Sequence, residues 1–167
     1  MPPKNLPVRP TTDFAKEGLF NILNNKVDFE DITVLDLFCG TGNISLEFAS
    51  RGAKKIVSID SHSPCLNYIR DTSKQIGFKN IFLERADVFS FLSKSHNQYD
   101  LIFADPPYEL PNIEKIYDLV FEKKCLTKNA FLIIEHGPKT DLSNKQYFIE
   151  CRNYGNVHFS FFHQNED

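Results

Sequence analysis

Short apolar runs alternate with amphipathic segments along most of this chain. The helical periodicity of the amphipathic segments predicts helices over residues 45–52, 64–77, 88–92 and 113–124. The apolar runs, bounded by Gly, Pro, Asp and Asn, predict buried strands over residues 32–38, 55–60, 80–87, 99–105 and 130–136. Because strands that are apolar on both faces and alternate with helices form parallel sheets covered on both sides, the pattern predicts an α/β fold.

The start of the chain predicts an extended segment followed by a helix. The first ten residues hold four prolines, which favour an extended lead-in over 1–10. Apolar residues then recur at helical spacing up to Leu23, and polar residues that suit a helix N-cap stand before them, namely Thr11, Thr12 and Asp13.

The end of the chain predicts a β-hairpin. Residues 146–154 and 157–163 read as strands that turn at Gly155-Asn156. Added to the five earlier strands, this gives a Rossmann-like, doubly wound sheet of seven strands, mostly parallel, with an antiparallel C-terminal strand. We expect the whole chain, 1–167, to form one domain.

Composition narrows the class of protein. Hydrophobic residues make up 41% of the chain and charged residues 25%, which is ordinary for a soluble globular domain. No apolar run approaches the roughly 20 residues that span a bilayer. The opening MPPKNLPVRP lacks the apolar core of a secretory signal, so we expect a cytoplasmic protein. The four cysteines and five histidines are scattered without ligand spacing, so we expect no metal site.

The charge balance argues against a general nucleic-acid binder. The chain has 19 Lys and Arg against 22 Asp and Glu, a net charge of −3, whereas nucleic-acid-binding domains are commonly basic. A nucleic acid would therefore be met by a local patch, with the help of a partner, or weakly.

Ligands of doubly wound sheets bind beyond the carboxyl ends of the strands, so the strand-end loops are the places to look for chemistry. The loop after the first strand contains Gly40 and Gly42, which permit a positive φ and a close approach of the backbone to a ligand. A tight strand-to-helix turn without a ligand is the alternative. The candidate cofactor-binding residues of this loop are Asp36, Phe38, Gly40, Gly42 and Asn43.

The second strand ends in an acid at the spacing of a ribose-binding residue. Asp60 follows Gly42 by 18 residues, near the spacing at which a carboxylate accepts ribose hydroxyls. Ser45 replaces the third glycine of the dinucleotide fingerprint, which makes close packing of the helix on the strand less favourable. Together these features predict a nucleoside ligand, without choosing between NAD and S-adenosylmethionine.

The third strand ends with a residue that has two interpretations. Asp87 stands where a carboxylate could accept a hydrogen bond from an adenine amine, and equally where it could cap a helix starting at Val88.

The fourth loop, D-P-P-Y (105–108), carries the most specific chemistry. The two prolines stiffen the loop and remove two N–H donors. Asp105 and the Pro106 carbonyl can each accept one hydrogen of an exocyclic amine, and Tyr108 can stack on the base that carries it. The structural alternative is a proline-stiffened turn with a capping Asp.

Taken together, these loops resemble the class I S-adenosylmethionine-dependent methyltransferases. The segment D-L-F-C-G-T-G (36–42), Asp60, Asp87 and D-P-P-Y are similar to the branch that methylates exocyclic or amide nitrogens, where a residue such as Phe38 in place of the first glycine is usual. R-P-T-T-D (9–13), K-E-G-L-F-N-I-L (16–23) and R-N-Y-G (152–155) further resemble the bacterial 16S rRNA guanine-N2 methyltransferase family, over about residues 8–163. Unlike that family, the chain has no basic segment before R-P-T-T-D.

The resemblance implies a cofactor, a substrate and residue roles. S-adenosylmethionine is held by Gly40, Gly42 and Asn43 at its methionine part, by Asp60 at the ribose and by Asp87 at the adenine, with Asp36 and Phe38 in the same loop. Asp105 and Pro106 orient the target amine, and Pro107 and Tyr108 hold the base. Arg9 and Thr12 contact the substrate, and Lys4, Arg9 and Lys16 form a local basic patch. The partner is 16S rRNA within a partly assembled small ribosomal subunit, and a monomer is expected.

Other functions remain open at this point. The D-P-P-Y loop also fits an N6-adenine-specific DNA methyltransferase. A cytosine C5 enzyme would need a thiolate such as Cys65 or Cys39 near the methyl donor. An NAD-dependent oxidoreductase has no use for D-P-P-Y. A ribosome-assembly module that binds without turnover is the alternative from another class.

Overall fold

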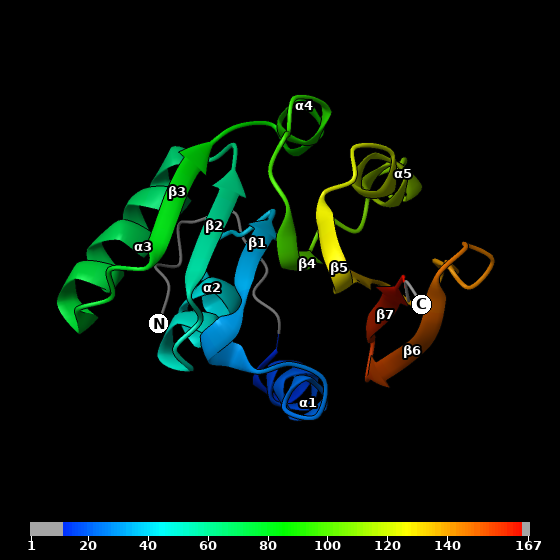
Figure 1. The fold of residues 1–167 in the computed structure, drawn as a ribbon, viewed down its shortest axis with the longest axis horizontal. Helices are drawn as coiled ribbons and strands as arrows, with labels where there is room; N and C mark the ends of the chain where they lie inside the picture. The colour runs from blue at the N-terminus through cyan, green and yellow to red at the C-terminus, as the bar shows by residue number, and fades with distance from the viewer. Residues whose placement is uncertain (1–11, 165–167) are drawn as a thin grey trace.

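A computed structural model describes residues 12–164, which form one seven-stranded sheet flanked by helices (Figure 1). The elements in chain order are α1 (Asp13–Leu23), the short 3₁₀ helix η1 (Phe29–Asp31), β1 (Thr33–Leu37), α2 (Asn43–Ser50), β2 (Lys55–Asp60), α3 (Ser63–Ile76), β3 (Ile81–Arg85), α4 (Val88–Ser93), β4 (Tyr99–Ala104), α5 (Glu114–Glu122), β5 (Leu126–His136), β6 (Phe148–Tyr154) and β7 (Val157–His163). The predicted lead-in over 1–10 lies outside the described residues.

The strand order is β3-β2-β1-β4-β5-β7-β6. The first five strands in sequence pair in parallel, and β7 runs antiparallel to both β5 and β6. The predicted doubly wound sheet with an antiparallel C-terminal strand is therefore confirmed. Chain order reverses between β1 and β4, so the loops that follow these two strands lie next to each other, as expected of a topological switch point.

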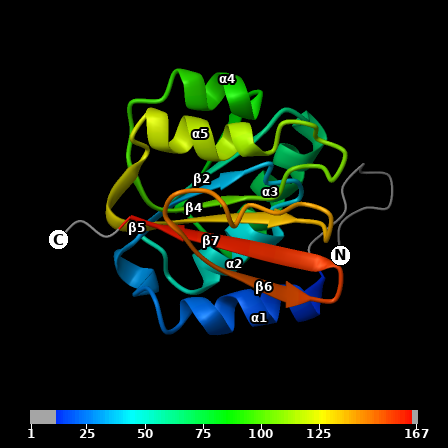
Figure 2. The same ribbon diagram turned by 90° about the vertical axis from the view of Figure 1, so that its right-hand side faces the viewer.

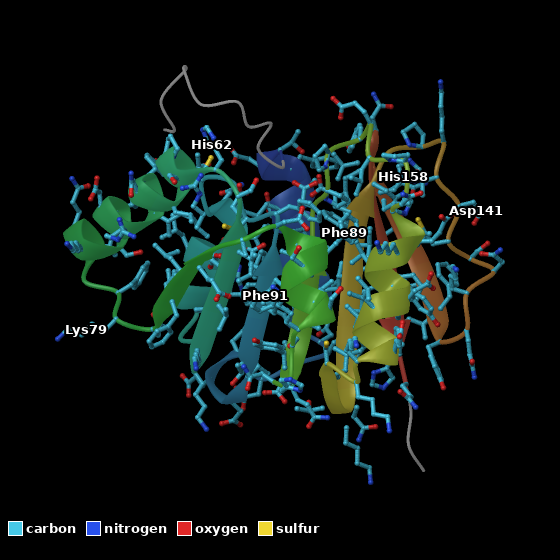
Figure 3. All side chains as sticks on the ribbon, turned by 90° about the horizontal axis from the view of Figure 1, so that it is seen from above. His62, Lys79, Phe89, Phe91, Asp141 and His158 are labelled. Carbon is cyan, nitrogen blue, oxygen red and sulfur yellow. The ribbon has the colours of Figure 1, made fainter. Side chains whose placement is uncertain are left out.

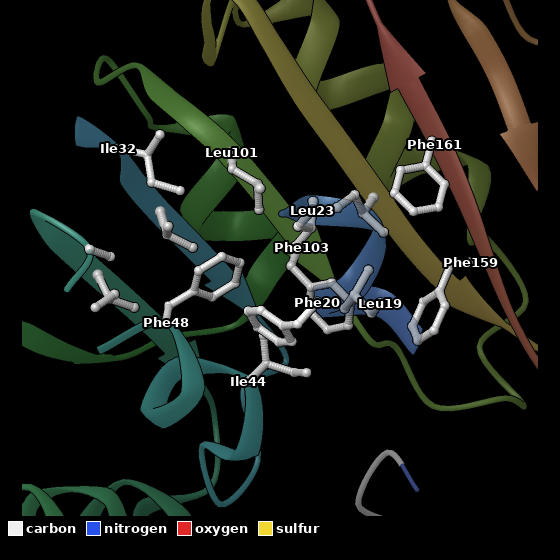
Figure 4. Close-up of a cluster of buried hydrophobic side chains, with 14 of the residues drawn as sticks. Leu19, Phe20, Leu23, Ile32, Ile44, Phe48, Leu101, Phe103, Phe159 and Phe161 are labelled. Carbon is white, nitrogen blue, oxygen red and sulfur yellow. The ribbon is translucent and has the colours of Figure 1, made fainter. Parts of the chain in front are cut away.

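Alternate side chains of the strands supply two cores, one on each face of the sheet. Figure 2 shows α4 and α5 over one face and α1 and α2 under the other. On the face of α1 and α2, Phe20 and Phe48 are fully buried, with ring centroids 4.8 Å apart (Figure 4). On the opposite face, Leu35 and Ile102 pack against α4 and α5. Strands apolar on both sides are what the near-continuous hydrophobic runs predicted.

Several boundaries differ from the sequence predictions, most of them by one or two residues. The strand predicted over 80–87 ends at Arg85, and the helix predicted over 45–52 spans Asn43–Ser50. The strand predicted over 130–136 begins earlier, at Leu126, although the residues that follow Leu126, Thr127 to Asn129, are polar. A register shift opposite β4 and a positive φ of 63° at Asn129 interrupt this strand, so its first half lacks the alternation that marks a strand in the sequence.

Candidate active site

A cavity of about 610 Å³ opens at the carboxyl ends of β1, β2 and β4. Nine of the residues singled out in the sequence lie around it, which brings the first, second and fourth loops into one site. They are Asp36, Phe38, Gly40, Asn43, Asp60, Asp105, Pro106, Pro107 and Tyr108. Figure 3 places His62, which also lines this cavity, toward the same edge of the molecule as His158, and Lys79 toward the opposite edge.

The first loop takes a backbone path that ordinary residues resist. Phe38, Gly40 and Gly42 have positive φ angles of 57°, 54° and 82°. For Phe38 such a conformation costs about 1–2 kcal/mol, which its packing against Phe89, with ring centroids 6.4 Å apart, helps to offset. A Cβ at Gly42 would lie 2.7 Å from the side chain of Ile69 on α3, so this position also has no room for a larger residue.

Asp60 joins the first and second loops. One of its carboxylate oxygens accepts the N–H of Gly40 at 2.9 Å, and the other accepts the N–H of His62 at 2.9 Å. A carboxylate has about four acceptor positions, so these two bonds leave capacity for ligand hydroxyls. The sequence pointed to Asp60 for its spacing from Gly42. The structure adds that Asp60 also fixes the shape of the loop.

Beneath the first loop lies a buried polar cluster formed by Asp36, Ser45 and Ser58. The Ser45 hydroxyl donates to Asp36 Oδ2 at 2.5 Å and lies 2.7 Å from the Ser58 hydroxyl. The prediction that Ser45 disfavours close packing of the helix was wrong, because Ser45 is fully buried and bonds to both strands beneath α2. Burial raises the pKa of Asp36 to about 7, although the hydrogen bond from Ser45 favours its charged form.

The D-P-P-Y loop forms a rigid turn at the mouth of the cavity. The Asp105 N–H donates to the Leu37 carbonyl at 3.2 Å, which fastens the loop to the end of β1, and the Leu110 N–H closes a turn on Pro107 at 3.0 Å. Pro106 is buried, whereas the Tyr108 side chain is 42% exposed. A ring at the mouth of a cavity, half open to solvent, is suited to stack on an entering planar group.

Two features of the mouth were missed in the sequence. Glu109 lines the cavity directly after Tyr108, and its only sequence signal is its position beside D-P-P-Y. Gly137, just beyond β5, lies under the Tyr108 ring: a Cβ at this position would lie 3.5 Å from it. That contact joins residues 29 positions apart in the chain, so no local pattern could have revealed it.

Both cysteines of the cavity are held as neutral thiols. Cys39 and Cys65 line the site. Burial raises the pKa of Cys39 well above its ordinary value and that of Cys65 to about 11. Since the thiolate is the nucleophile in cysteine chemistry, these environments argue against the cytosine C5 mechanism.

Other candidate residues lie elsewhere. The Asp87 carboxylate accepts the Ser90 N–H at 2.9 Å and so caps α4, and Thr12 caps α1 by accepting the Ala15 N–H at 3.1 Å. Neither lines the described part of the cavity. Lys16 Nζ donates to Asn43 Oδ1 at 3.0 Å and thus joins α1 to the first loop. Lys4 and Arg9 lie outside the described residues.

Among residues 12–164, no three His, Cys, Asp or Glu side chains gather in a group that could hold a metal ion. No helix in the same part of the chain combines the length and hydropathy needed to cross a bilayer.

Comparisons with known proteins point to one group. The model of a family described as "Conserved hypothetical protein 95" matches residues 1–163. The ribosomal RNA small subunit methyltransferase D of Buchnera aphidicola subsp. Acyrthosiphon pisum is 31% identical over 141 residues, which cover 83% of this chain and 73% of that protein. The protein of the same name from Haemophilus influenzae is 30% identical over 135 residues, 77% of this chain and 67% of its own length.

A solved structure shares the fold. The Thermus thermophilus 16S rRNA N2 G1207 methyltransferase, in complex with AdoMet and guanosine, superposes with a TM-score of 0.75 at 18% identity. The match covers 96% of this chain and 45% of that one. At this identity the likeness supports the class I methyltransferase architecture of the sheet.

Proposed function

The chain belongs to the family described as Conserved hypothetical protein 95, and from this premise we propose that it is an S-adenosylmethionine-dependent methyltransferase that acts on the exocyclic N2 amine of a guanine in small-subunit ribosomal RNA. The observation that carries the proposal is that the loops of Gly40 and Asp60 and the D-P-P-Y loop line one cavity. The names of the relatives support methyl transfer to rRNA, and they favour S-adenosylmethionine over NAD. We further propose that residues 1–167 form one catalytic domain.

The cavity residues of the first and second loops fit a nucleoside that carries an amino-acid chain. The backbone around Gly40 approaches the cavity without a side chain, and Asn43 begins α2, whose first N–H groups favour a carboxylate. Asp60 would accept the ribose hydroxyls. The cofactor supplies a methyl group on a sulfonium, which makes it a ready target for a nucleophilic nitrogen. Asp87 is kept as a candidate for the adenine amine, although its described contact is the cap of α4.

The residues of the mouth would orient the target amine. Asp105 and the Pro106 carbonyl accept its two hydrogens and aim the nitrogen lone pair into the cavity. Because the nitrogen gains positive charge as the new bond forms, a carboxylate beside it stabilises the transition state. Tyr108 and Pro107 hold the plane of the base, which must leave its stack to enter.

The hydrogen-bonding groups of the mouth favour guanine over adenine. Guanine presents two kinds of donor on its Watson–Crick edge, N1–H and the N2 amine, whereas adenine N1 is an acceptor. The described side chains that line the mouth beside Tyr108 are the acceptors Asp105 and Glu109. An N6-adenine DNA methyltransferase is the second candidate, since the D-P-P-Y loop by itself accommodates either amine.

The net charge bears on the state of the RNA substrate. With a net charge of −3, the protein has little general attraction for phosphate. We therefore propose that it acts, as a monomer in the cytoplasm, on 16S rRNA already folded within a partly assembled small subunit. Lys16, which bonds to Asn43 of the cavity, would supply the local cations together with Arg9 and Lys4, and Thr12 would contact the substrate at the start of α1.

Methyl transfer from labelled S-adenosylmethionine tests the proposal. Initial rates are compared on naked 16S rRNA, partly assembled small subunits and duplex DNA, and the product nucleosides are identified by mass spectrometry. We expect N2-methylguanosine, formed fastest on the partly assembled particles. Methyladenine formed on duplex DNA would move the assignment to the second candidate, and binding of RNA without turnover would indicate an assembly module.

A further inference from the structure

A second cavity lies apart from the D-P-P-Y site, in a groove of about 630 Å³ between α1 and the edge strand β6. Figure 2 shows α1 beside β6. The side chains that give the groove its character are Phe14, Asn21, Asn25, Lys26, Arg152 and Tyr154. None of them takes part in the proposed methyl transfer.

The groove contains a pair of aromatic side chains, one of which is largely exposed to solvent. Phe14 is 67% exposed, the largest exposure among the large hydrophobic side chains of the described residues. Its ring meets that of Tyr154 edge to face, with centroids 5.4 Å apart and planes at 78°. Tyr154 is fixed in turn by Gly18, because only a residue without a side chain leaves room for its ring. A flat ligand could stack on Phe14 with its edge against Tyr154.

The charges of the groove are already paired. Lys26 Nζ lies 3.6 Å from Glu150, and Arg152 Nε lies 3.0 Å from the same carboxylate. Glu17 adds a further acid to the lining. The groove therefore does not attract phosphate strongly. Its aromatic rings suit a planar base that stacks on them, and the amide of Asn21, about two turns of α1 beyond Phe14, adds a donor and an acceptor to the same groove.

The end of the groove formed by Phe14 and Tyr154 lies toward the same edge of the sheet as the methyl-transfer cavity. Because β6 runs antiparallel to β7, and β7 antiparallel to β5, Tyr154 at the end of β6 lies at the same edge of the sheet as the ends of β4 and β5. Helix α1 links the two sites, since it carries Phe14 in the groove and Lys16, which bonds to Asn43 of the cavity.

We propose that this groove binds an unpaired base of the RNA, one that flanks the target nucleotide and stacks on Phe14. The proposal rests on the proposed function for its ligand class. It explains how a protein with a net charge of −3 holds RNA, since stacking contributes about 1–3 kcal/mol per base and needs no excess of cations.

Removal of the exposed ring tests the proposal. Phe14→Ala should raise the KM for 16S rRNA about tenfold, on naked RNA and on partly assembled subunits alike, while kcat and S-adenosylmethionine affinity stay unchanged. Phe14→Tyr should restore the wild-type KM, because a tyrosine ring also stacks. Phe82→Ala is the matched control, since Phe82 is also an exposed phenylalanine, at 52%, and lies on β3 at the other end of the sheet. Thermal melting checks that each variant is folded.

The outcomes separate the groove from the methyl-transfer site. Equal KM values for Phe14→Ala and Phe82→Ala would overturn the proposal. A KM raised on assembled subunits but not on naked RNA would overturn it in favour of a protein partner. Equilibrium binding of a fluorescent single-stranded RNA is measured alongside. If the wild type binds RNA but transfers no methyl group, the proposed function fails, and the groove is judged by the loss of binding in Phe14→Ala. If the wild type binds no RNA, the groove proposal is refuted.

Discussion

The ring of Tyr154 on β6 lies so close to Gly18 on α1 that a Cβ at Gly18 would be 2.1 Å from it. Real non-bonded atoms do not approach to this distance, so a side chain at Gly18 would have to displace the Tyr154 ring. The contact joins the segments K-E-G-L-F-N-I-L and R-N-Y-G, both of which resemble the 16S rRNA guanine-N2 methyltransferase family in sequence. It forms one wall of the groove between α1 and β6.

The first prediction concerns this contact. Gly18→Ala gains about 1 kcal/mol of helix propensity, but it must push the Tyr154 ring away from Phe14 and Phe159, which costs about 1–3 kcal/mol. We expect a net destabilisation of about 1 kcal/mol, measured by urea denaturation. In a Tyr154→Ala background the clash is gone, so the same Gly18→Ala change should be stabilising. The same sign in both backgrounds would show that the contact does not restrict position 18.

How much of the structure was predictable depends on the range of the interactions involved. Asp60 and Asp105 could be placed from the sequence, because each stands at the end of a strand and parallel strands end at the same edge of a sheet. The contacts of Gly18 with Tyr154 and of Gly137 with Tyr108 could not, because they join distant segments through the packing of one side chain. The Ser45 error has the same origin: its partners Asp36 and Ser58 lie on two strands, and only their register places them together.

The second prediction separates catalysis from cofactor binding. Asp105→Asn keeps the size of the side chain but removes the charge that would stabilise the developing positive nitrogen. We expect kcat to fall at least 100-fold, with S-adenosylmethionine affinity within a few-fold of wild type. Tyr108→Phe should keep most of the activity, since stacking survives, whereas Tyr108→Ala should lose most of it. Wild-type turnover by Tyr108→Ala would contradict the stacking role.

The third prediction compares two strand-end acids. Asp60→Ala should weaken S-adenosylmethionine binding by about 1–3 kcal/mol, because it removes an acceptor for the ribose and releases the N–H groups of Gly40 and His62. Asp87→Ala is the paired variant: as a helix cap it should cost about 1 kcal/mol of stability and little affinity. Calorimetric titration and thermal melting are both needed. A loss of affinity in Asp87→Ala would instead support contact with the adenine amine.

The fourth prediction follows from the raised pKa of Asp36. Its pKa in the folded protein is about 7, against 3.8 as the ordinary value, so the folded state binds a proton more tightly than the unfolded state between these pH values. This contribution to stability is therefore complete below about pH 4 and declines by about 1.4 kcal/mol per pH unit as pH rises toward 7. Asp36→Asn lacks this dependence.

Unfolding free energies of wild type and Asp36→Asn, measured between pH 5 and pH 8, test this linkage. The difference should move steadily in favour of the variant as pH rises and level off above about pH 7. Ser45→Ala removes the hydrogen bond that favours the charged form, so it should extend the decline to higher pH. A difference that does not change with pH would mean that Asp36 is ionised throughout this range.

The last prediction tests whether Glu109 selects guanine. A carboxylate at the mouth accepts the N1–H of guanine, and 2-aminopurine is the probe, because it keeps the amine at position 2 but has a lone pair in place of N1–H and a hydrogen in place of O6. The wild type, with S-adenosylhomocysteine present, should bind guanosine about tenfold more tightly than 2-aminopurine riboside, a discrimination of the size that one good base-edge contact supplies. Glu109→Gln keeps the size of the side chain, and its amide can donate to the bare N1, so the preference should shrink or reverse. Glu84→Gln on β3, outside the lining of the cavity, should behave as wild type. If Glu109→Gln weakens the binding of both nucleosides equally, Glu109 only supports the loop. The choice between guanine and adenine would then rest with Asp105 and Tyr108.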